Sequence, residues 1–450
     1  MVSSDRLSKL LFLGSSAVIG FGLVFGAGAV AQYYNLPPVK QFNIALSTLS
    51  SDSVSPPLKH MQPRRVEGDG VVVNERPDDD ALIMLTGFFD GENQIRLIER
   101  DGAVVKKWSL DYFEHFPDRS QRECNLASPL DVDIHGAIVT PSAEVVLNYE
   151  YCGTVKLDQC GNMMWSMNLP NHHSLVAAED GGYWILGREY WNAAKEPDRF
   201  PPFSMPGKNV LMREDTVLKV SEDGEILDEF SIPVMLIENG LESVLTANGM
   251  NFYWSQVIGS EIVHANQAVE LHSEIADQFP QFEAGDLAIS MRELNLVIVI
   301  DPQTRTVKWH QTGPWIRQHD AEFRPDGRLS IFNNNTYRLE YIDYNHHNPA
   351  STARSNIIAI DPVTRETEVL VGETPEQAFL SVVRGQHSLL DDDGTLVVEF
   401  DAGRVFEVDA DGTIVWDYVN SVDEDWVGEI TNADRLMPSY FTEPLKQCSE

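Results

Sequence analysis

Five of the twelve histidines stand at one recurring place in the sequence, at or just before a short apolar strand. They are His135, His173, His264, His319 and His387, and 38 to 91 residues separate successive ones. An imidazole side chain can ligate a metal ion, move a proton near neutral pH, or attack an electrophile. If the fold brings these side chains together, they form a site that could do any of the three.

An arginine in an apolar strand helps to choose among these three chemistries. Arg292 stands in the apolar run 287–301, where a guanidinium is costly unless it meets an anion or a carboxylate. The sequence has no His-x-His pair and no cluster of thiolates, so we expect no metal. The combination favours a nucleophilic histidine, with Arg292 and other histidines holding an anionic group during its transfer.

A repeat in the sequence predicts the fold that would gather these residues. Six hairpins each combine an apolar strand, a turn that is most often Asp-Gly or Asp-Pro-x-Thr, and a closing strand. The copies span residues 95–108, 155–165, 217–230, 296–309, 357–370 and 405–416. A second strand pair precedes most of them, which makes four strands per unit.

Six four-stranded units predict an all-β fold, a six-bladed β-propeller. Two stacked β-sandwiches are the alternative, but the repeat period fits them poorly. The first strand of each blade lines the central channel of a propeller, so the five histidines should meet there. Segments 189–215, 241–262 and 271–285 interrupt the pattern, and we expect them to be loop insertions, some of them helical.

The N-terminus predicts the compartment. No charge interrupts residues 10–31, which is long enough for a helix to cross a hydrocarbon core of about 30 Å. Arg6 and Lys9 precede this stretch, so residues 1–9 should be cytoplasmic and the rest extracytoplasmic. A cleaved signal peptide is the alternative, because Ala29-Val30-Ala31 resembles a cleavage site.

The remaining chain divides into two parts. Residues 32–76 are rich in Pro and Ser and predict a linker, and residues 77–450 form the predicted propeller. We therefore expect a single-pass protein of the inner membrane with a periplasmic bulk.

Composition limits the function classes. Lys and Arg number 33 against 69 Asp and Glu, which gives a formal net charge of −36. Because phosphate contacts need Lys and Arg, this charge argues against a nucleic-acid-binding protein. Hydrophobic residues make up 43% of the chain, enough for a core.

Cys152 and Cys160 flank a short strand and its turn, and we expect them to pair, since extracytoplasmic thiols oxidise. The state of Cys124 and Cys448 is left open.

Beyond these patterns, the chain resembles the bacterial arylsulfotransferases that do not use the nucleotide sulfate donor. The likeness runs from about residue 80 to 420, and the Gln-His-Asp segment at 318–335 is its most specific part. The other segments that carry it are 172–186, 263–271, 290–301 and 403–416. The resemblance implies a six-bladed propeller that moves a sulfuryl group from a phenolic sulfate ester to a phenol through a sulfated histidine, in two half-reactions and without a cofactor.

The resemblance also implies roles for residues of this chain. His319 would be the nucleophile that becomes sulfated. His264 and Arg292 would bind the sulfuryl oxygens, and His173 would complete the cluster, with His172 as its substitute. The acidic segment between His264 and Arg292 departs from the family's pattern, which makes the role of Arg292 less secure than that of His319.

Substrate contacts and partners complete the expectation. We expect His387 and Asn266 to bind substrate in the channel. The partners would be a phenolic sulfate donor, a phenol acceptor and the membrane, with no nucleic acid, and the sequence leaves a homodimer open. One competing hypothesis is a non-catalytic, membrane-anchored propeller that binds a protein or a glycan. Another is a hydrolase or lyase that uses the same histidines, with or without a metal.

Overall fold

The computed structural model describes most of the chain after residue 58. The described residues are 59–117, 124, 126–192, 194–196, 198–199, 211–247, 261–336, 354–446 and 448. The predicted membrane segment 10–31 lies outside this part of the chain. Within the described part, no helix combines the length and the apolar character that crossing a membrane requires.

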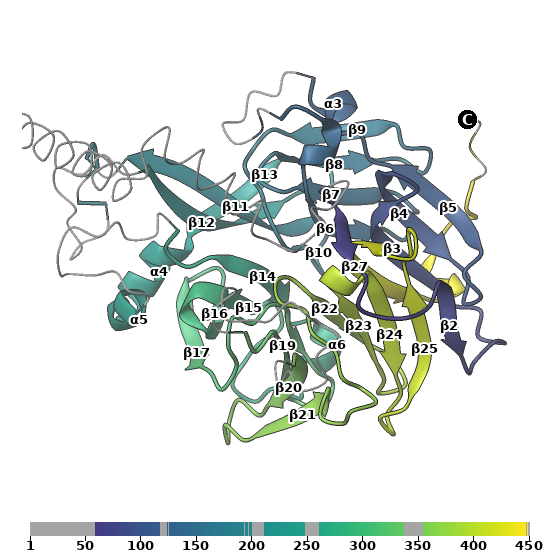
Figure 1. Cartoon of the computed structure of the whole chain (residues 1–450). Coiled ribbons are helices and arrows are strands. Elements are labelled where there is room, and N and C mark those ends of the chain that lie inside the picture. Colours follow the sequence, from purple (N-terminus) through teal and green to yellow (C-terminus); the bar gives the residue numbers. More distant parts are fainter. Residues whose placement is uncertain are drawn as a thin grey trace, which may run out of the picture. The chain divides into compact units, whose positions relative to one another are not determined.

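Six antiparallel sheets surround a central channel and confirm the predicted propeller (Figure 1). Each sheet is one blade, whose first strand is innermost and whose last strand is outermost. Blade 1 is β27 (Ile430–Leu436), β3 (Leu82–Phe89), β4 (Glu92–Ile98) and β5 (Val104–Ser109). Blade 2 is β6 (Ile134–Val139), β7 (Val145–Tyr149), β8 (Gly153–Leu157) and β9 (Met163–Met167). Blade 3 is β10 (Leu175–Ala177), β11 (Tyr183–Asn192), β12 (Leu211–Val220) and β13 (Ile226–Ser231).

The other three blades repeat this order. Blade 4 is β14 (Ala265–Glu270), β15 (Leu287–Met291), β16 (Leu296–Asp301) and β17 (Thr306–Thr312). Blade 5 is β18 (Ala321–Phe323), β19 (Leu329–Asn333), β20 (Asn356–Ile360) and β21 (Thr367–Val371). Blade 6 is β22 (Gln386–Leu389), β23 (Thr395–Glu399), β24 (Arg404–Val408) and β25 (Ile414–Val419), with β2 (Gly70–Asn74) as a fifth, outermost strand.

All six predicted hairpins are the third and fourth strands of a blade, and their tryptophans explain how blades pack. The third strands are buried on both faces because each blade stacks on its neighbours, as in β16. The Trp108 Nε1–H donates to the Asp158 carbonyl in the hairpin turn of the next blade, at 3.2 Å. Trp165 and Trp416 donate to the corresponding turns of their next blades, at 2.9 Å each. An indole at the closing strand therefore joins consecutive blades.

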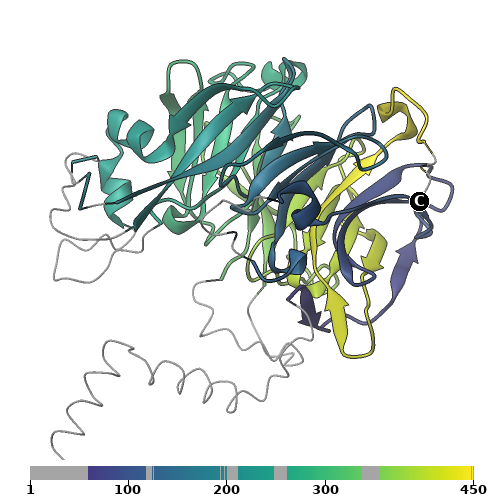
Figure 2. The ribbon, with the colours of Figure 1, turned by 90° about the horizontal axis from the view of Figure 1, so that it is seen from above.

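The ring closes through strands from opposite ends of the described chain. Strand β27 pairs with β3 and supplies the innermost strand of blade 1, so the purple and yellow strands lie side by side (Figure 2). β1 (Met61–Pro63) also pairs with β26 (Trp426–Gly428). The linker predicted at 32–76 is therefore wrong over residues 59–76, because β1 forms a small separate sheet with β26 and β2 is the outermost strand of blade 6. The rest of that linker lies outside the described residues.

The predicted insertions are partly strand and partly helix. The interruption at 189–215 prolongs β11 and β12, which stay paired out to Asn192 and Leu211. Three short helices lie in or near the other two: α4 (Ile232–Glu238), α5 (Glu242–Ala247) and α6 (Ser273–Ala276). A further short helix, α3 (Tyr112–His115), follows blade 1.

The cysteine pairing expected from the sequence is wrong. The disulfides join Cys124 to Cys152 and Cys160 to Cys448, with Cα–Cα distances of 5.5 Å in both. Cys152 directly precedes strand β8, and Cys160 lies in the turn after it. A five-residue strand separates two such cysteines by more than about 15 Å, so they cannot reach each other.

The Cys160–Cys448 disulfide gives a first prediction. It joins residues 288 apart and ties the tail after β27 to blade 2. We expect the double variant Cys160→Ser/Cys448→Ser to lower the free energy of unfolding by about 2–4 kcal/mol, because the unfolded chain gains freedom. Denaturant unfolding without reductant measures the difference, and the same titration with reductant is the control. Equal unfolding free energies without reductant would contradict the prediction.

Candidate active site

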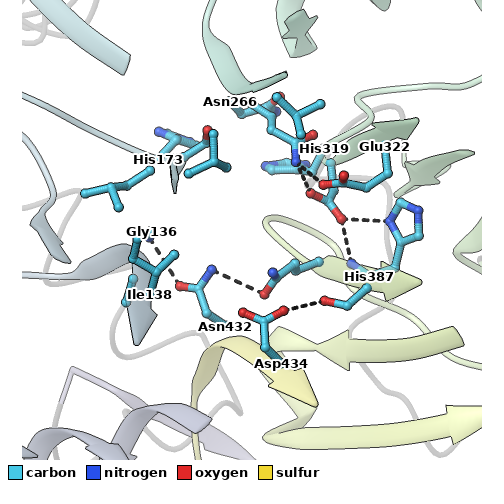
Figure 3. A pocket seen from close by; sticks show the side chains of 18 of the residues that line it. Gly136, Ile138, His173, Asn266, His319, Glu322, His387, Asn432 and Asp434 are labelled. Atoms are coloured by element: carbon cyan, nitrogen blue, oxygen red, sulfur yellow. Dashed lines mark hydrogen bonds and ion pairs between the residues drawn. The ribbon is translucent and has the colours of Figure 1, made fainter. Parts of the chain in front are cut away.

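Four of the five predicted histidines gather in one cluster around His173. Its ring centroid lies 4.0 Å from that of His135, 4.9 Å from that of His264 and 6.3 Å from that of His319. Their side chains come from blades 2 to 5, so the propeller brings together residues that are far apart in sequence. His387, from blade 6, lies in the same channel but pairs elsewhere (Figure 3).

The backbone before each innermost strand positions these rings. His173 and His264 adopt left-handed conformations, with φ of 50° and 48°, which cost about 1–2 kcal/mol for a residue with a side chain. Neighbouring groups hold them in place: the Asn148 side chain donates to the His173 carbonyl at 3.2 Å, and the Arg292 N–H donates to the His264 carbonyl at 3.0 Å. The strain therefore occurs where the rings turn into the cluster.

Hydrogen bonds select one neutral tautomer of His319. The Asn334 amide donates through Nδ2 to the carbonyls of Ser381 and Arg384, at 2.8 and 2.6 Å. Its Oδ1 must therefore face His319 Nδ1, 2.7 Å away, which carries the proton and donates. His319 Nε2 is left with a lone pair and accepts the Arg384 backbone N–H at 3.2 Å. This ring is neutral and nucleophilic at Nε2.

Burial and charge keep the cluster neutral. Burial lowers the pKa of His319 well below its usual value, and the nearby Arg292 charge lowers it further. Burial and then the surrounding imidazoles do the same to the pKa of His173. Burial lowers the pKa of His135 to about 4, and burial with Arg292 lowers the pKa of His264. All four rings are therefore uncharged at neutral pH, and each keeps one nitrogen lone pair.

Three imidazoles form a chain of contacts that could carry a proton. His264 Nδ1 lies 2.8 Å from Glu261 Oε2, and His264 Nε2 lies 3.2 Å from His173 Nε2. On the other side of that ring, His173 Nδ1 lies 2.8 Å from His172 Nδ1. The chain ends at His172 Nε2, which lies 3.2 Å from the Gly187 carbonyl. We call this set, from Glu261 through His264 and His173 to His172, the imidazole relay.

Carboxylates fix the relay and balance its arginines. Burial by itself would raise the pKa of Glu261, but the His264 contact and nearby charges lower it to about 2, so it is ionised. Glu150 Oε1 lies 3.6 Å from His135 Nδ1 and 3.7 Å from His173 Nδ1, and its Oε2 accepts from Arg384 at 2.7 Å. Each ring thus has a carboxylate or a carbonyl to orient it.

Arg292, the cation predicted from the sequence, lies beside the histidine cluster, but in a different element from the predicted strand. Arg292 occupies a one-turn 3-10 helix (Arg292–Leu294) between β15 and β16, not a strand. Its guanidinium lies 3.1 Å from Glu293 Oε1, which Arg317 contacts at 3.0 Å. The buried Arg292 Nε has no hydrogen-bond partner among the described residues. That N–H is available to an anion.

A cavity of about 480 Å³ runs along the innermost strands from this cluster (Figure 3). His135, His173 and His319 line it, and so do the predicted substrate-binding residues His387 and Asn266. His387 contacts Asp320 Oδ2 through Nδ1 at 2.7 Å and Ser330 Oγ through Nε2 at 2.7 Å, so other side chains hold its ring. Of the predicted residues, His264 and Arg292 are absent from this lining.

Within the described part of the chain, two groups of side chains have the composition of metal ligands. In the cluster, atoms of His135, Glu150 and His173 lie within 4.8 Å of one another. Glu150 is already paired with Arg384, and His173 with His172, so a metal there would have to displace both contacts. The second group, His60, Asp133 and Glu429, lies apart from the relay, and an imidazole–carboxylate contact of 3.2 Å accounts for it.

Sequence reasoning missed two residues that contact the predicted nucleophile. Asn334 belongs to the run Asn333–Asn335, where nothing local distinguishes the member that faces His319. Arg384 acts on His319 through its backbone N–H, at a left-handed residue with φ of 59°. Neither contact has a sequence signal, because both depend on packing between β18, β19 and the segment before β22.

Comparison with known proteins identifies the family. The sequence model of the arylsulfotransferase family (ASST) matches residues 135–421. The chain belongs to the arylsulfotransferase family. This confirms the resemblance noted from the sequence, and the matched range contains the four clustered histidines and Arg292 of this arylsulfotransferase.

The other comparisons find only distant similarity. No curated protein matches this family member. A solved protein of unknown function from Bacteroides caccae is similar at 11% identity over 80% of this chain and 99% of that chain, with a TM-score of 0.49. Virginiamycin B lyase from Staphylococcus aureus is similar at 13% identity over 65% and 72%, with a TM-score of 0.36. TolB from Acinetobacter baumannii is similar at 12% over 81% and 68%, with a TM-score of 0.40. At these values, no argument about this chain rests on them.

The His319 tautomer is directly testable. At pH 6 we expect a neutral His319 ring with its proton on Nδ1, because burial and Arg292 lower its pKa and Asn334 accepts that proton. Long-range ¹H–¹⁵N spectra of the ¹⁵N-histidine-labelled protein report the tautomer, and a His319→Gln sample assigns the signals. In Asn334→Leu the preference for Nδ1–H should be lost. A charged ring, or a proton on Nε2, would contradict the assignment.

Proposed function

We propose that this arylsulfotransferase moves a sulfuryl group from a phenolic sulfate ester to a phenol through sulfated His319. The observation that carries the proposal is the fixed, neutral His319 ring, whose Nε2 lone pair lies beside Arg292 and the imidazole relay. A nucleophile of this kind needs no base to remove a proton from it before it attacks. A non-catalytic propeller would have no use for a ring held in this state.

The first half-reaction would use His319 and the donors around it. Nε2 attacks the sulfur, an N–S bond forms, and the S–O bond of the ester breaks with its electron pair leaving on the phenol oxygen. Charge on the sulfuryl oxygens would meet the free Nε–H of Arg292 and the backbone N–H of Arg384, which His319 Nε2 gives up as its lone pair bonds the sulfur. Preformed donors of this kind stabilise developing charge better than water does, since they need no reorganisation.

The imidazole relay would act as the base for the acceptor. Its His173 and His264 rings are neutral, so the departing phenolate takes its proton from solvent in the first half-reaction. In the second half-reaction an acceptor phenol gives its proton to His264 or His173, whose neighbours in the relay share the charge, its oxygen attacks the sulfur, and the N–S bond breaks. The relay then releases that proton to solvent. His319 is regenerated in its starting tautomer, which predicts ping-pong kinetics because one site serves both phenols in turn.

We also propose that residues 10–31 anchor the propeller on the extracytoplasmic face of the inner membrane. Both disulfides support this location, because such bonds persist in oxidising compartments. The N-terminal charge pattern of the sequence is consistent with it.

The nucleophile gives the central prediction. The full-length protein, with p-nitrophenyl sulfate as donor, should release at most one equivalent of p-nitrophenol without an acceptor and should turn over repeatedly only when an acceptor phenol is present. His319→Ala should lose about 10³-fold or more of this activity. Mass spectrometry after donor alone should find one sulfuryl group on the His319 peptide. His310→Ala, in the outer strand β17, is the matched control and should retain activity.

Three outcomes would contradict this function. Full activity of His319→Ala would remove the proposed nucleophile. Release of more than one equivalent of phenol without an acceptor would indicate a sulfatase. Absence of transfer to any phenol, with a correctly folded protein, would favour the non-catalytic propeller.

The acid limb of the pH profile gives another prediction. Attack requires neutral His319, so kcat/KM should fall as the pH drops through the pKa of this group. Burial and Arg292 lower that pKa, so activity should persist below the ordinary histidine value of about 6.5. In Arg292→Gln the missing charge should raise the pKa and move the limb to higher pH. In Arg292→Lys the limb should stay near its wild-type position. An unmoved limb in Arg292→Gln would contradict the charge effect.

A further inference from the structure

Three carboxylates share the cavity with the imidazoles. Asp320, Glu322 and Asp434 line it, from blades 5 and 1, and Glu322 and Asp434 are partly exposed toward it (Figure 3). The described lining residues include no lysine and no arginine. A cavity in a protein that handles anionic esters thus has an acidic wall.

The contacts of these carboxylates leave acceptor capacity toward the cavity. The Gln267 amide donates to Asp320 Oδ1 and Glu322 Oε1, at 2.6 Å each, and Ser388 Oγ donates to Asp434 Oδ1 at 2.7 Å. Asp320 also contacts the His387 ring, at 2.7 Å. Among the described residues, no cationic side chain forms an ion pair with Glu322 or Asp434.

The energetics of the carboxylates agree with a missing positive charge. Burial and the neighbouring Asp320 raise the pKa of Glu322 well above its usual range. Burial raises the pKa of Asp434 to about 6, the Ser388 hydrogen bond opposes it, and Asp320 adds to the rise. A cation placed between these groups would reverse both effects, since it favours the ionised carboxylates.

A second, independent observation points to a ligand with hydrogen-bond donors. Asn266 lines the same cavity and is only 6% exposed. Its Nδ2 donates to the Gln318 carbonyl at 2.9 Å, so Oδ1 is the atom left over, and that oxygen has no partner among the described residues. A buried carbonyl oxygen without a donor is costly unless a ligand supplies one.

Size and lining favour an organic cation over a metal ion. A cavity of about 480 Å³ lies in the range of small-molecule sites, and apolar side chains such as Ile138, Val176 and Phe323 line part of it. A bare divalent cation would leave those apolar side chains without a role. An aromatic ring that carries an ammonium group would use both kinds of surface.

We propose that the acceptor is a phenolic amine, with its ammonium at Glu322, Asp434 and Asn266 Oδ1 and its hydroxyl at His319. This rests on the proposed function. Asp320 and Glu322 line the cavity together with His319, and the Cα atoms of His319 and Glu322 are at most about 10 Å apart. One aromatic ring with a short chain matches such a span.

A series of matched acceptors tests the proposal on the full-length protein. Tyramine, 4-ethylphenol and 3-(4-hydroxyphenyl)propionate share a ring and differ in charge. With p-nitrophenyl sulfate as donor, we expect kcat/KM for tyramine to exceed that for 4-ethylphenol by about tenfold or more, and the propionate to be poorest. The double variant Glu322→Gln/Asp434→Asn should reduce the ratio of the first two toward one. Glu229→Gln, in the exposed strand β13, should keep it.

A binding measurement separates this inference from the proposed function. Calorimetry of tyramine with metal-free protein and no donor should show binding that the double variant weakens by about tenfold. Tyramine binding without any sulfuryl transfer would support the cation site and overturn the proposed function. Transfer to all three acceptors with equal efficiency would overturn the cation site and leave the function standing. Tight binding of Ca²⁺ or Mg²⁺ that excludes tyramine would also overturn it. If the double variant unfolds, the wild-type acceptor series and calorimetry still decide.

Discussion

The pairing of β27 with β3 is the constraint on which the rest of this structure depends. A propeller sheet is stable only when its blades form a complete ring, because each blade buries both faces against its neighbours. The chain supplies five complete blades in sequence, and blade 1 lacks its innermost strand until β27 pairs with β3. The same closure brings Asn432 and Asp434 into the channel, opposite the histidines of the other blades. Closure of the ring and assembly of the site are therefore one event.

Inside that ring of blades, burial is the main cause of the lowered pKa values of the imidazoles. Water is excluded from the cluster, so the neutral forms are favoured, and hydrogen bonds then decide which nitrogen of each ring holds the proton. For His319 the decision comes from Asn334, whose amide is itself oriented by two carbonyls. A side chain with no charge and no contact with the transferred group thus sets the nucleophilic atom. Left-handed backbone at His173 and His264 is the local cost of this arrangement.

The charge of −36 has a more specific meaning once the site is described. An anionic sulfate ester calls for positive charge where it binds. The arginines around the cluster are instead paired: Arg384 with Glu150, Arg188 with Asp215, and Arg292 and Arg317 with Glu293. Positive charge is therefore balanced locally, and the available donors are individual N–H groups. The charged side chains that line the cavity are carboxylates. The sulfate group of a substrate would therefore bind at the histidine cluster, and the rest of the substrate would lie along the acidic cavity.

The sequence by itself determined the repeat, the six outer hairpins and the place of the histidines within each unit. These features are local, since alternation, Asp-Gly turns and closing tryptophans act over a few residues. Tertiary structure alone decided the pairing of the cysteines, the strands at 61–63 and 70–74, and the innermost strand of blade 1. It also decided the contacts of His319 with Asn334 and Arg384, which lie 15 and 65 residues away. The physical reason is that these contacts form between blades, where packing and ring closure choose partners that no local pattern records.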